Sequence, residues 1–342
     1  MALASTLRAR LAGPGLALGG APLGNLFGAL DDANVNDVVR AAFEAGIRYF
    51  DTAPHYGHGL SERRMGDALR ARPRDSYVLS TKVGRLLSPE VAAPCDQYGY
   101  VATLPFVQRY DYSGVGVRRS IEDSLQRLGL ARVDLVFVHD VDADTHGSEH
   151  PGRFRTLLDD GLPALARLKE EGVIGGYGLG VNEVEICLDT LRHADLDVLL
   201  VAGRYTLVDQ TALDRLLPEC EARDVAVVLG GPFNSGILAT GASPANGQPP
   251  FFNYAPAPPA VIARVAAIER VCAAFAVPLA AAALQFPRGH PAVACVLAGA
   301  RSIAEVEFNL AAARHPIPRA FWQALADDGL VAPDTPVPPA VS

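Results

Sequence analysis

Residues 120–140 read SIEDSLQRLGLARVDLVFVHD, a helical pattern that runs into an apolar segment ending on a histidine and an aspartate. The first half repeats apolar residues every three or four positions, which is typical of an amphipathic helix. The segment VDLVFVH (133–139) is largely apolar and does not alternate, which is typical of a parallel strand covered on both faces. The stretch therefore predicts one helix–strand unit of a parallel α/β fold.

The same unit recurs through most of the chain. Eight apolar runs alternate with helical patterns, which predicts a (β/α)8 TIM barrel. We place the barrel at about residues 16–313 and a C-terminal helix and tail at 314–342, within a single domain, 1–342. A doubly wound sheet is the competing fold, but neither LALGGAPLGNL nor GYGLGVNE has its usual GxGxxG spacing. The predicted strands are residues 16–20, 47–51, 77–82, 133–139, 175–180, 197–203, 225–231 and 292–299.

Two stretches fall outside this repeat. Residues 86–112 are irregular and aromatic, and residues 234–259 are rich in Pro, Gly and Ser. In a barrel both would be extended βα loops above the catalytic face, where we expect substrate specificity to reside. The proline-rich tail after Asp328 is expected to fray.

Composition excludes several classes of protein. The chain has 342 residues and a net charge of −8, which argues against a nucleic-acid partner. Polar residues interrupt every apolar stretch before it could span a membrane, and the start lacks a signal-peptide core, so we expect a cytoplasmic protein. Five scattered cysteines without a CxxC pair argue against a disulfide framework. No pattern predicts a metal site or an oligomeric state.

Polar residues recur at the carboxyl ends of successive predicted strands. Asp51 ends the second strand, with Tyr56 in the following loop, and Lys82, His139 and Asn182 end the next three. In a barrel these ends converge on the catalytic face. We therefore expect the five side chains to form one site.

The residue types indicate proton transfer to or from a carbonyl or alcohol oxygen. A tyrosine titrates near pH 10 by itself, and we expect the Lys82 ammonium to lower the pKa of Tyr56. Asp51 would hold Lys82 charged, and His139 would position the substrate oxygen. Such a site needs a hydride partner, which implies a nicotinamide cofactor.

The motifs FDTAPHYG (50–57), STKVG (80–84), DLVFVHD (134–140), GLGVNE (178–183) and LAGARSIAEVEFNL (297–310) resemble the aldo-keto reductase family. The resemblance implies that Asp51, Tyr56, Lys82 and His139 form a catalytic tetrad and that Asn182 contacts the nicotinamide carboxamide. It extends from about Leu16 to Ala313.

More narrowly, the chain is similar to a branch of that family that oxidises ring hemiacetals to lactones. This branch contains D-threo-aldose 1-dehydrogenase, L-fucose and L-galactose dehydrogenases, and pyridoxal 4-dehydrogenase. The resemblance implies an NAD-dependent oxidation of an aldose at C1 to the lactone. The alternatives are a pyridoxal 4-dehydrogenase, a general aldehyde or ketone reductase, and, in another class, a regulatory protein that senses the cofactor.

The resemblance also places the cofactor. Ala202 and Gly230 stand where relatives commonly have a glutamine and a stacking aromatic residue, so Phe233 or Tyr205 would have to clamp the nicotinamide instead. Glu305 stands where NADP-preferring relatives bind the 2′-phosphate, which implies that NAD is preferred over NADP. The cofactor contacts expected beside Asn182 are Gly231, Pro232, Phe233, Gly236, Gly299, Ala300, Arg301, Glu305 and Asn309.

The substrate contacts are the least constrained part of the site. The loop PHYGH (54–58) places His55 and His58 on either side of Tyr56, and we expect both to face the substrate. From the loop 86–112, the pocket would take a mixture of Tyr98, Tyr100, Phe106 and Arg109, which fits a sugar or pyridoxal.

Overall fold

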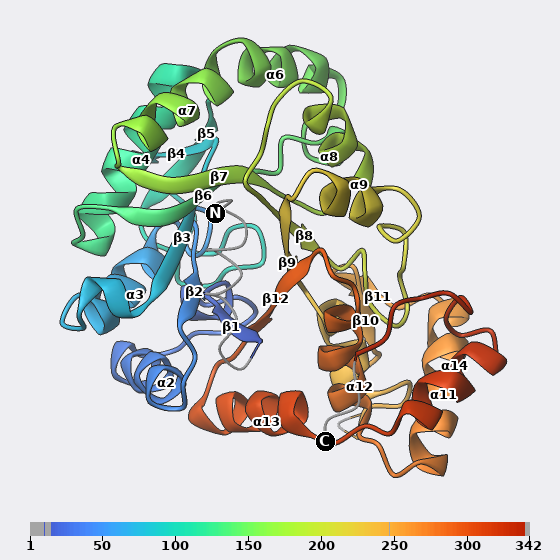
Figure 1. Ribbon diagram of the computed structural model, residues 1–342. Coiled ribbons are helices and arrows are strands. Elements are labelled where there is room, and N and C mark those ends of the chain that lie inside the picture. Colours follow the sequence, from blue (N-terminus) through green and yellow to red (C-terminus); the bar gives the residue numbers. More distant parts are fainter. Residues whose placement is uncertain (1–9, 11–14, 246, 339–342) are drawn as a thin grey trace.

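Eight parallel strands close into a barrel in this computed structural model, which describes residue 10, residues 15–245 and residues 247–338 (Figure 1). Around the barrel the order is β1-β12-β9-β8-β7-β6-β3-β2, and β1 pairs with both β2 and β12. The predicted barrel is confirmed, and each predicted strand is present within a residue or two of its expected bounds. The strands are β1 (Leu16–Gly19), β2 (Tyr49–Asp51), β3 (Val78–Val83), β6 (Val133–His139), β7 (Ile174–Val181), β8 (Val198–Ala202), β9 (Ala226–Gly230) and β12 (Val293–Gly299).

The apolar runs predict these strands because each strand is buried on both faces. Alternate residues, such as Leu135 and Phe137 in β6, fill the inside of the barrel, while Val136 and Val138 pack under the helices. Gly180 in β7 leaves the room that this filling needs, since an added Cβ would lie 3.0 Å from Phe137 and 3.5 Å from the Lys82 chain.

Helices cover the outside of the barrel, and several begin at the caps that the sequence indicates. Ser113 accepts a hydrogen bond from the backbone N–H of Gly116 at the start of α4, and Gly129 ends this helix in a left-handed conformation. The helices are α2 (Asp32–Glu44), α3 (Leu60–Leu69), α4 (Gly114–Leu128), α5 (Ala143–His146), α6 (His150–Thr156), α7 (Leu162–Glu170), α8 (Val184–Leu191), α9 (Leu216–Ala222), α10 (Ile237–Thr240), α11 (Pro259–Ala274), α12 (Leu279–Gln285), α13 (Ile303–Arg314) and α14 (Arg319–Asp327).

The two stretches outside the repeat have more order than their sequences indicate. Strands β4 (Arg85–Pro89) and β5 (Phe106–Tyr110) pair antiparallel at the two ends of the segment 86–112, while residues 90–105 between them form the irregular loop that was expected. Within 234–259, β10 (Phe251–Phe252) and β11 (Ala255–Pro256) form a second, shorter hairpin. The first hairpin lies between β3 and α4 in the chain, yet β3 still pairs directly with β6 in the barrel.

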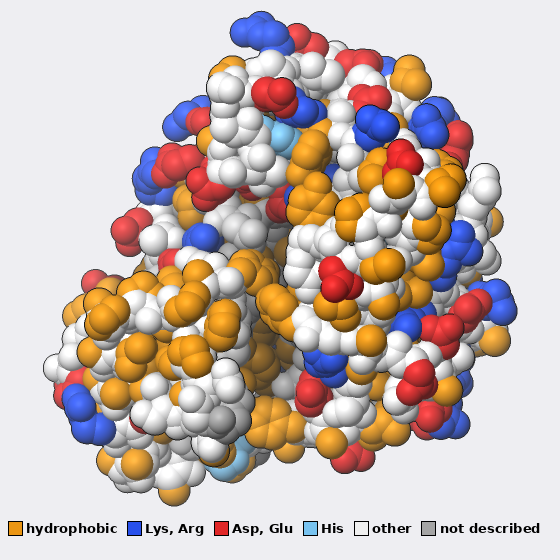
Figure 2. All heavy atoms as spheres, turned by 180° about the vertical axis from the view of Figure 1, so that it is seen from behind, with side chains coloured by type: hydrophobic (Ala, Val, Ile, Leu, Met, Phe, Trp, Pro, Cys, Tyr) orange, Lys and Arg blue, Asp and Glu red, His pale blue; other side chains and the backbone are white. Residues whose placement is uncertain are grey.

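The C-terminal segment packs on the barrel instead of fraying. Leu330, Val331 and Thr335 are all buried, although the last four residues lie outside the described part. Helices α11 and α14 stand as a lobe beside the barrel, and from behind the surface is hollowed between this lobe and the rest (Figure 2). In the part of the chain that is described, no helix is long and apolar enough to cross a membrane.

Candidate active site

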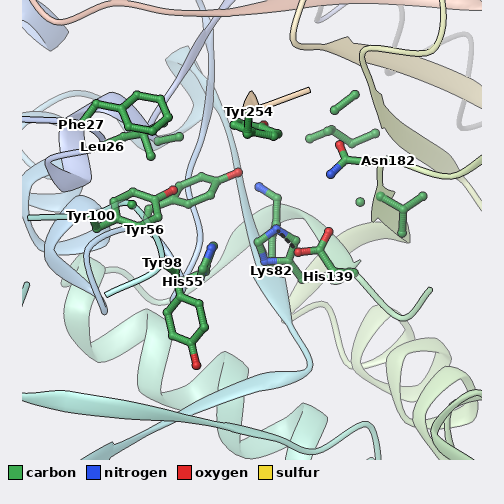
Figure 3. Close-up of a pocket in the computed structure, with 17 residues that line it drawn as sticks. Leu26, Phe27, His55, Tyr56, Lys82, Tyr98, Tyr100, His139, Asn182 and Tyr254 are labelled. Carbon is green, nitrogen blue, oxygen red and sulfur yellow. Dashed lines mark ion pairs between the residues drawn. The ribbon is translucent and has the colours of Figure 1, made fainter. Parts of the chain in front are cut away.

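A cavity of about 430 Å³ opens at the carboxyl ends of the barrel strands (Figure 3). Tyr56, Lys82, His139 and Asn182 all line it, so the structure brings together residues from four successive βα units. Asn182 lies across the cavity from Tyr56, with Lys82 and His139 between them. This volume is in the range of small-molecule sites.

Asp51 lies directly behind the cavity, paired with Lys82. The Lys82 Nζ donates to Asp51 Oδ2 at 2.6 Å and to the Thr52 carbonyl at 3.0 Å, and both ionic side chains are only 1 % exposed. Ser80 donates to the other Asp51 oxygen at 2.6 Å. Burial raises the pKa of Asp51, whereas the Lys82 charge lowers it. The lysine is therefore fixed in orientation by groups outside the cavity.

Tyr56 lies beside this pair but is not hydrogen-bonded to it. The Lys82 Nζ is 4.8 Å from the centre of the Tyr56 ring, and the Tyr56 hydroxyl makes no hydrogen bond to a described residue. Burial, and then the negative charge of Asp51, raise the pKa of Tyr56 well above its usual value. The net direction is thus opposite to the one expected from Lys82, because loss of hydration dominates the pKa of Tyr56.

His139 completes the arrangement as a neutral imidazole. Its ring meets the Tyr56 ring edge-on with 5.9 Å between centres. Burial, followed by the positive charges of Arg85 and Lys82, lowers the pKa of His139 well below its usual value. The Asp140 carboxylate lies 3.5 Å from Nε2, which favours the tautomer with its proton on that nitrogen, while Nδ1 is buried without a partner among the described atoms.

Two residues of the β4–β5 hairpin, Arg85 and Gln108, support the cavity wall from behind, and the sequence does not predict this role. Arg85 is buried and donates to the carboxylate of Asp140 and, at 3.0 Å, to Gln108 Oε1. Gln108 in turn donates to His55 Nδ1 at 2.7 Å. His55 and Asp140 both line the cavity, so one guanidinium organises two polar groups on its wall.

The two predicted substrate histidines separate. His55 lines the cavity, but His58 is fully buried, with Nδ1 2.7 Å from the Phe106 carbonyl, and does not reach it. The placement of His58 therefore differs from expectation, because the glycine that follows Tyr56 turns the chain with φ +66°. The tyrosines expected from this loop, Tyr98 and Tyr100, do line the cavity, whereas Phe106 and Arg109 do not.

Three aromatic side chains from three different loops surround the cavity mouth. Phe27, Tyr98 and Tyr254 are each more than 60 % exposed, and all have a left-handed backbone, with φ of 59°, 54° and 62°. This conformation is costly for a bulky residue and is concentrated at functional sites. Phe27 and Tyr254 have no spacing signal in the sequence that could have identified them.

Asn182 lines the cavity just after the end of β7. Its carbonyl oxygen accepts from Arg204 at 2.6 Å, while its side-chain amide makes no hydrogen bond to a described residue and faces the cavity beside Ala202. Tyr205, in contrast, is fully buried against Phe286 and cannot stack on a ligand. Phe233 packs partly on the core and does not line the cavity, so neither proposed aromatic substitute reaches the cavity.

The segment after β9 has the backbone shape expected of a ligand cradle. Gly231 and Gly236 have φ of 58° and 107°, and Asn234 and Ser235 between them are also left-handed. The Asn234 side chain donates to the Gly203 carbonyl at 3.1 Å, but its Oδ1 is buried without a partner among the described atoms. Pro232 lies in this turn, and the unpaired oxygen is consistent with a ligand group bound nearby.

The residues expected to bind the adenosine end of the cofactor form hydrogen bonds mainly within the protein. Arg301 donates to the carbonyls of Leu26 and Gly28 at 3.0 and 3.1 Å. Glu305 accepts from the Arg301 backbone N–H at 2.8 Å and leaves its carboxylate at the exposed start of α13. Asn309 donates to the Gly299 carbonyl at 3.1 Å, next to the buried Ala300, which makes it a support for β12 and not a free ligand group.

Among the described residues, no three His, Cys, Asp or Glu side chains come together in a way that could hold a metal ion. The five cysteines are free thiols, and all except Cys95 are buried.

Comparisons with known proteins agree with this geometry. The sequence profile described as "Aldo/keto reductase family" matches residues 15–327. The chain is 43% identical to pyridoxal 4-dehydrogenase of Microbacterium luteolum, over 92% of this chain and 94% of that one. It is 38% identical to D-threo-aldose 1-dehydrogenase of a Pseudomonas species, over 94% and 96% of the two chains. Among solved structures, the holo form of aldo-keto reductase AKR11C1 from Bacillus halodurans matches with a TM-score of 0.70 and 25% identity, over 92% of this chain and 91% of that one.

Proposed function

Because the chain belongs to the aldo/keto reductase family, we propose that it is an NAD-dependent dehydrogenase that oxidises a cyclic hemiacetal, an aldose at C1, to the lactone. The observation that carries this proposal is the meeting of Tyr56, the Lys82–Asp51 pair and His139 around one cavity. The two relatives described above are named as dehydrogenases of pyridoxal and of an aldose. Both compounds form ring hemiacetals.

Tyr56 is the proton-transfer group in this proposal. Its hydroxyl has no partner among the described residues, so it is available to the substrate oxygen. In the oxidative direction the Tyr56 oxygen accepts the hydroxyl proton as the C–H bond on the same carbon breaks. A bound oxidised nicotinamide would supply the hydride acceptor, together with a positive charge that favours the phenolate.

Lys82 and His139 prepare this step. Lys82 is paired with Asp51 and lies beside the Tyr56 ring, where an ammonium stabilises negative charge on the phenol oxygen. His139 is neutral, and in this proposal its Nε2–H donates to the substrate oxygen and fixes its position. These two groups favour the transition state without gaining or losing a proton themselves.

The preference for NAD is part of the same proposal. The family resemblance aligns Glu305 with residues that bind the 2′-phosphate in NADP-preferring relatives, and the Arg301 guanidinium that could offset its charge is bonded to the loop after β1. A ribose hydroxyl can donate to the carboxylate, whereas a phosphate is repelled.

Pyridoxal is a second candidate substrate, and the mouth of the cavity favours it. Phe27, Tyr98 and Tyr254 offer aromatic faces on which a planar pyridine ring could stack. The regulatory alternative, a protein that only senses the cofactor, is disfavoured because all four tetrad side chains are present and assembled around the cavity.

A substrate panel tests the proposal. NADH appearance should be followed with L-fucose, L-galactose, other aldoses and pyridoxal, and each active substrate repeated with NADP. We expect oxidation of at least one ring hemiacetal, with kcat/KM at least tenfold higher for NAD. No oxidation of any of them, with either cofactor, would overturn the assignment.

The cofactor preference has its own matched pair of variants. Glu305→Gln removes the carboxylate at the start of α13 and should narrow the NAD advantage several-fold. Glu307→Gln, an exposed carboxylate on the same helix, should leave the advantage unchanged. Equal effects from both variants would show that Glu305 does not face the cofactor.

A further inference from the structure

A second buried ion pair borders the cavity, and neither of its two residues belongs to the tetrad. Arg85 is 5 % exposed and its guanidinium donates to Asp140 Oδ2, while the Asp140 side chain is 16 % exposed and lines the cavity. Asp140 follows His139 in a left-handed conformation, with φ of 44°. Its other oxygen, Oδ1, makes no hydrogen bond to a described residue.

No free cation faces the cavity from the described residues. Lys82 and Asp140 are its charged lining residues, since His55 and His139 are neutral, and Lys82 is already paired with Asp51. The Arg85 charge is likewise matched by Asp140. An anionic group on a substrate would therefore meet a carboxylate without an available counter-ion.

The same wall offers hydrogen bonds to neutral groups. His55 Nδ1 accepts from Gln108 and also lies 3.4 Å from an Arg85 nitrogen, so the proton of the neutral ring is on Nε2. Burial, and then the charge of Arg85, lower the pKa of His55 and keep it neutral. A donor on His55 and an acceptor on Asp140, both bound to one guanidinium, complement the adjacent hydroxyls of a neutral substrate.

We propose that Asp140, held by Arg85, makes this cavity selective for uncharged hydroxyl-bearing substrates and excludes those that carry a phosphate or carboxylate. This inference rests on the proposed function and refines its substrate class. An ion pair that only anchored the hairpin to the barrel would affect stability but would not change the ratio between neutral and anionic substrates.

The test compares D-glyceraldehyde with D-glyceraldehyde 3-phosphate, reduced with NADH, because the two differ only in the distal phosphate. We expect kcat/KM to favour the neutral aldehyde by roughly 100-fold. Asp140→Asn should narrow this ratio at least tenfold, because the amide keeps an acceptor but loses the charge. The control is Asp142→Asn, a buried carboxylate that caps α5 outside the cavity, and it should leave the ratio unchanged.

A second variant avoids disturbing the buried pair. Tyr98 is exposed at the cavity mouth, and Tyr98→Lys would add the missing cation there and raise kcat/KM for the phosphorylated aldehyde. Two results would overturn this inference without affecting the proposed function. One is equal kcat/KM for the two aldehydes in the unmodified protein. The other is a ratio of the two kcat/KM values that neither Asp140→Asn nor Tyr98→Lys changes. Absence of hydride transfer to both aldehydes and to the whole hemiacetal panel would instead refute the proposed function, and the inference with it.

Discussion

Two buried carboxylates at opposite ends of the barrel illustrate how similar groups serve different purposes. Asp134, near the start of β6, is 4 % exposed and accepts from Arg10 at 2.9 Å, from Arg74 at 2.6 Å and from the Leu79 N–H at 2.8 Å. A third guanidinium, that of Arg132, lies 3.6 Å away. Asp51, at the end of β2, is matched by a single cation, Lys82.

The difference lies in what each cluster leaves unsatisfied. Around Asp134 several donors share one carboxylate, and this residue does not line the active-site cavity. Beside the Asp51–Lys82 pair, the Tyr56 hydroxyl has no hydrogen-bond partner in the described part of the chain and faces a cavity. An ion pair alone is therefore weak evidence of catalysis, whereas an ion pair next to an unpaired titratable group and an open space is strong evidence.

The largest expected effect is on kcat, and it should differ between the tyrosine near Asp51 and the tyrosine near Asp134. Tyr56→Phe should lower kcat by roughly 10²–10⁴-fold, because the proton-transfer group is lost. Tyr77→Phe, near Asp134, should not change kcat and should not destabilise the protein, since the Tyr77 hydroxyl is buried without a partner among the described atoms. Steady-state kinetics and urea unfolding measure both effects. Turnover that survives in Tyr56→Phe would break the comparison.

The carboxylates themselves should show the next largest difference. Asp51→Asn leaves a buried ammonium unpaired and should cost about 3–5 kcal/mol of unfolding free energy, together with most of the activity. Asp134→Asn should lower the unfolding free energy by about 1–2 kcal/mol and leave kcat unchanged. The loss is smaller because Arg10 and Arg74 are partly exposed and keep hydrogen bonds to backbone carbonyls.

A double variant sharpens this result. Asp51→Asn combined with Lys82→Met removes both charges and should recover much of the stability without recovering activity. If the double variant regained turnover, the pair would serve only the fold. Urea unfolding and NADH appearance, measured on the same preparations, distinguish the two outcomes.

The pH dependence should also report from the cavity. The pKa of Tyr56 is raised, so the phenol is protonated at neutral pH and the phenolate fraction grows about tenfold per pH unit. The oxidation rate should therefore rise with pH from neutrality, with a slope approaching one in log kcat. His139 does not contribute to this slope, because its pKa is lowered and the ring is already neutral. A flat profile in Tyr77→Phe and the unmodified protein alike would contradict the role of Tyr56.

The smallest expected effect is at the far end of the barrel. Arg132→Ala should change the unfolding free energy by about 0.5 kcal/mol or less and leave kcat/KM unchanged, because Arg10 and Arg74 still hold Asp134. Thermal or urea unfolding measures it. If Arg132→Ala lowered the unfolding free energy as much as Asp51→Asn, Arg10 and Arg74 alone would not be enough to stabilise Asp134.

The sequence predicts the barrel well because each strand is buried on both faces. Such a strand has a continuous apolar sequence, which is easy to recognise. The same runs predict where Lys82, His139 and Asn182 lie, since a polar residue that ends a buried strand must emerge at the catalytic face. The hairpin of β4 and β5 gives no such signal, because Arg85 and Gln108 face a polar network and break the alternation of a two-stranded sheet.

Other parts of the site depend on conformation that the residue pattern does not encode. Whether His55 or His58 reaches the cavity is decided by a tight turn at Gly57, where an added Cβ would lie 2.4 Å from the Gly24 carbonyl oxygen. Whether the pKa of Tyr56 is raised or lowered depends on how completely the ring is buried, and no local sequence motif predicts this burial. Tyr254 reaches the cavity from a hairpin that has only two residues in each strand.

The position of the β4–β5 hairpin has an evolutionary consequence. It lies between β3 and α4 without interrupting the pairing of β3 with β6, and it carries Arg85 and Gln108, which anchor the cavity wall, together with Tyr98, one of the three aromatic residues at the mouth. Recombination at its two ends could thus exchange the whole hairpin, and the substrate contacts on it, between related genes in one event. Enzymes descended from one ancestral barrel could then act on different substrates while they keep the same reaction.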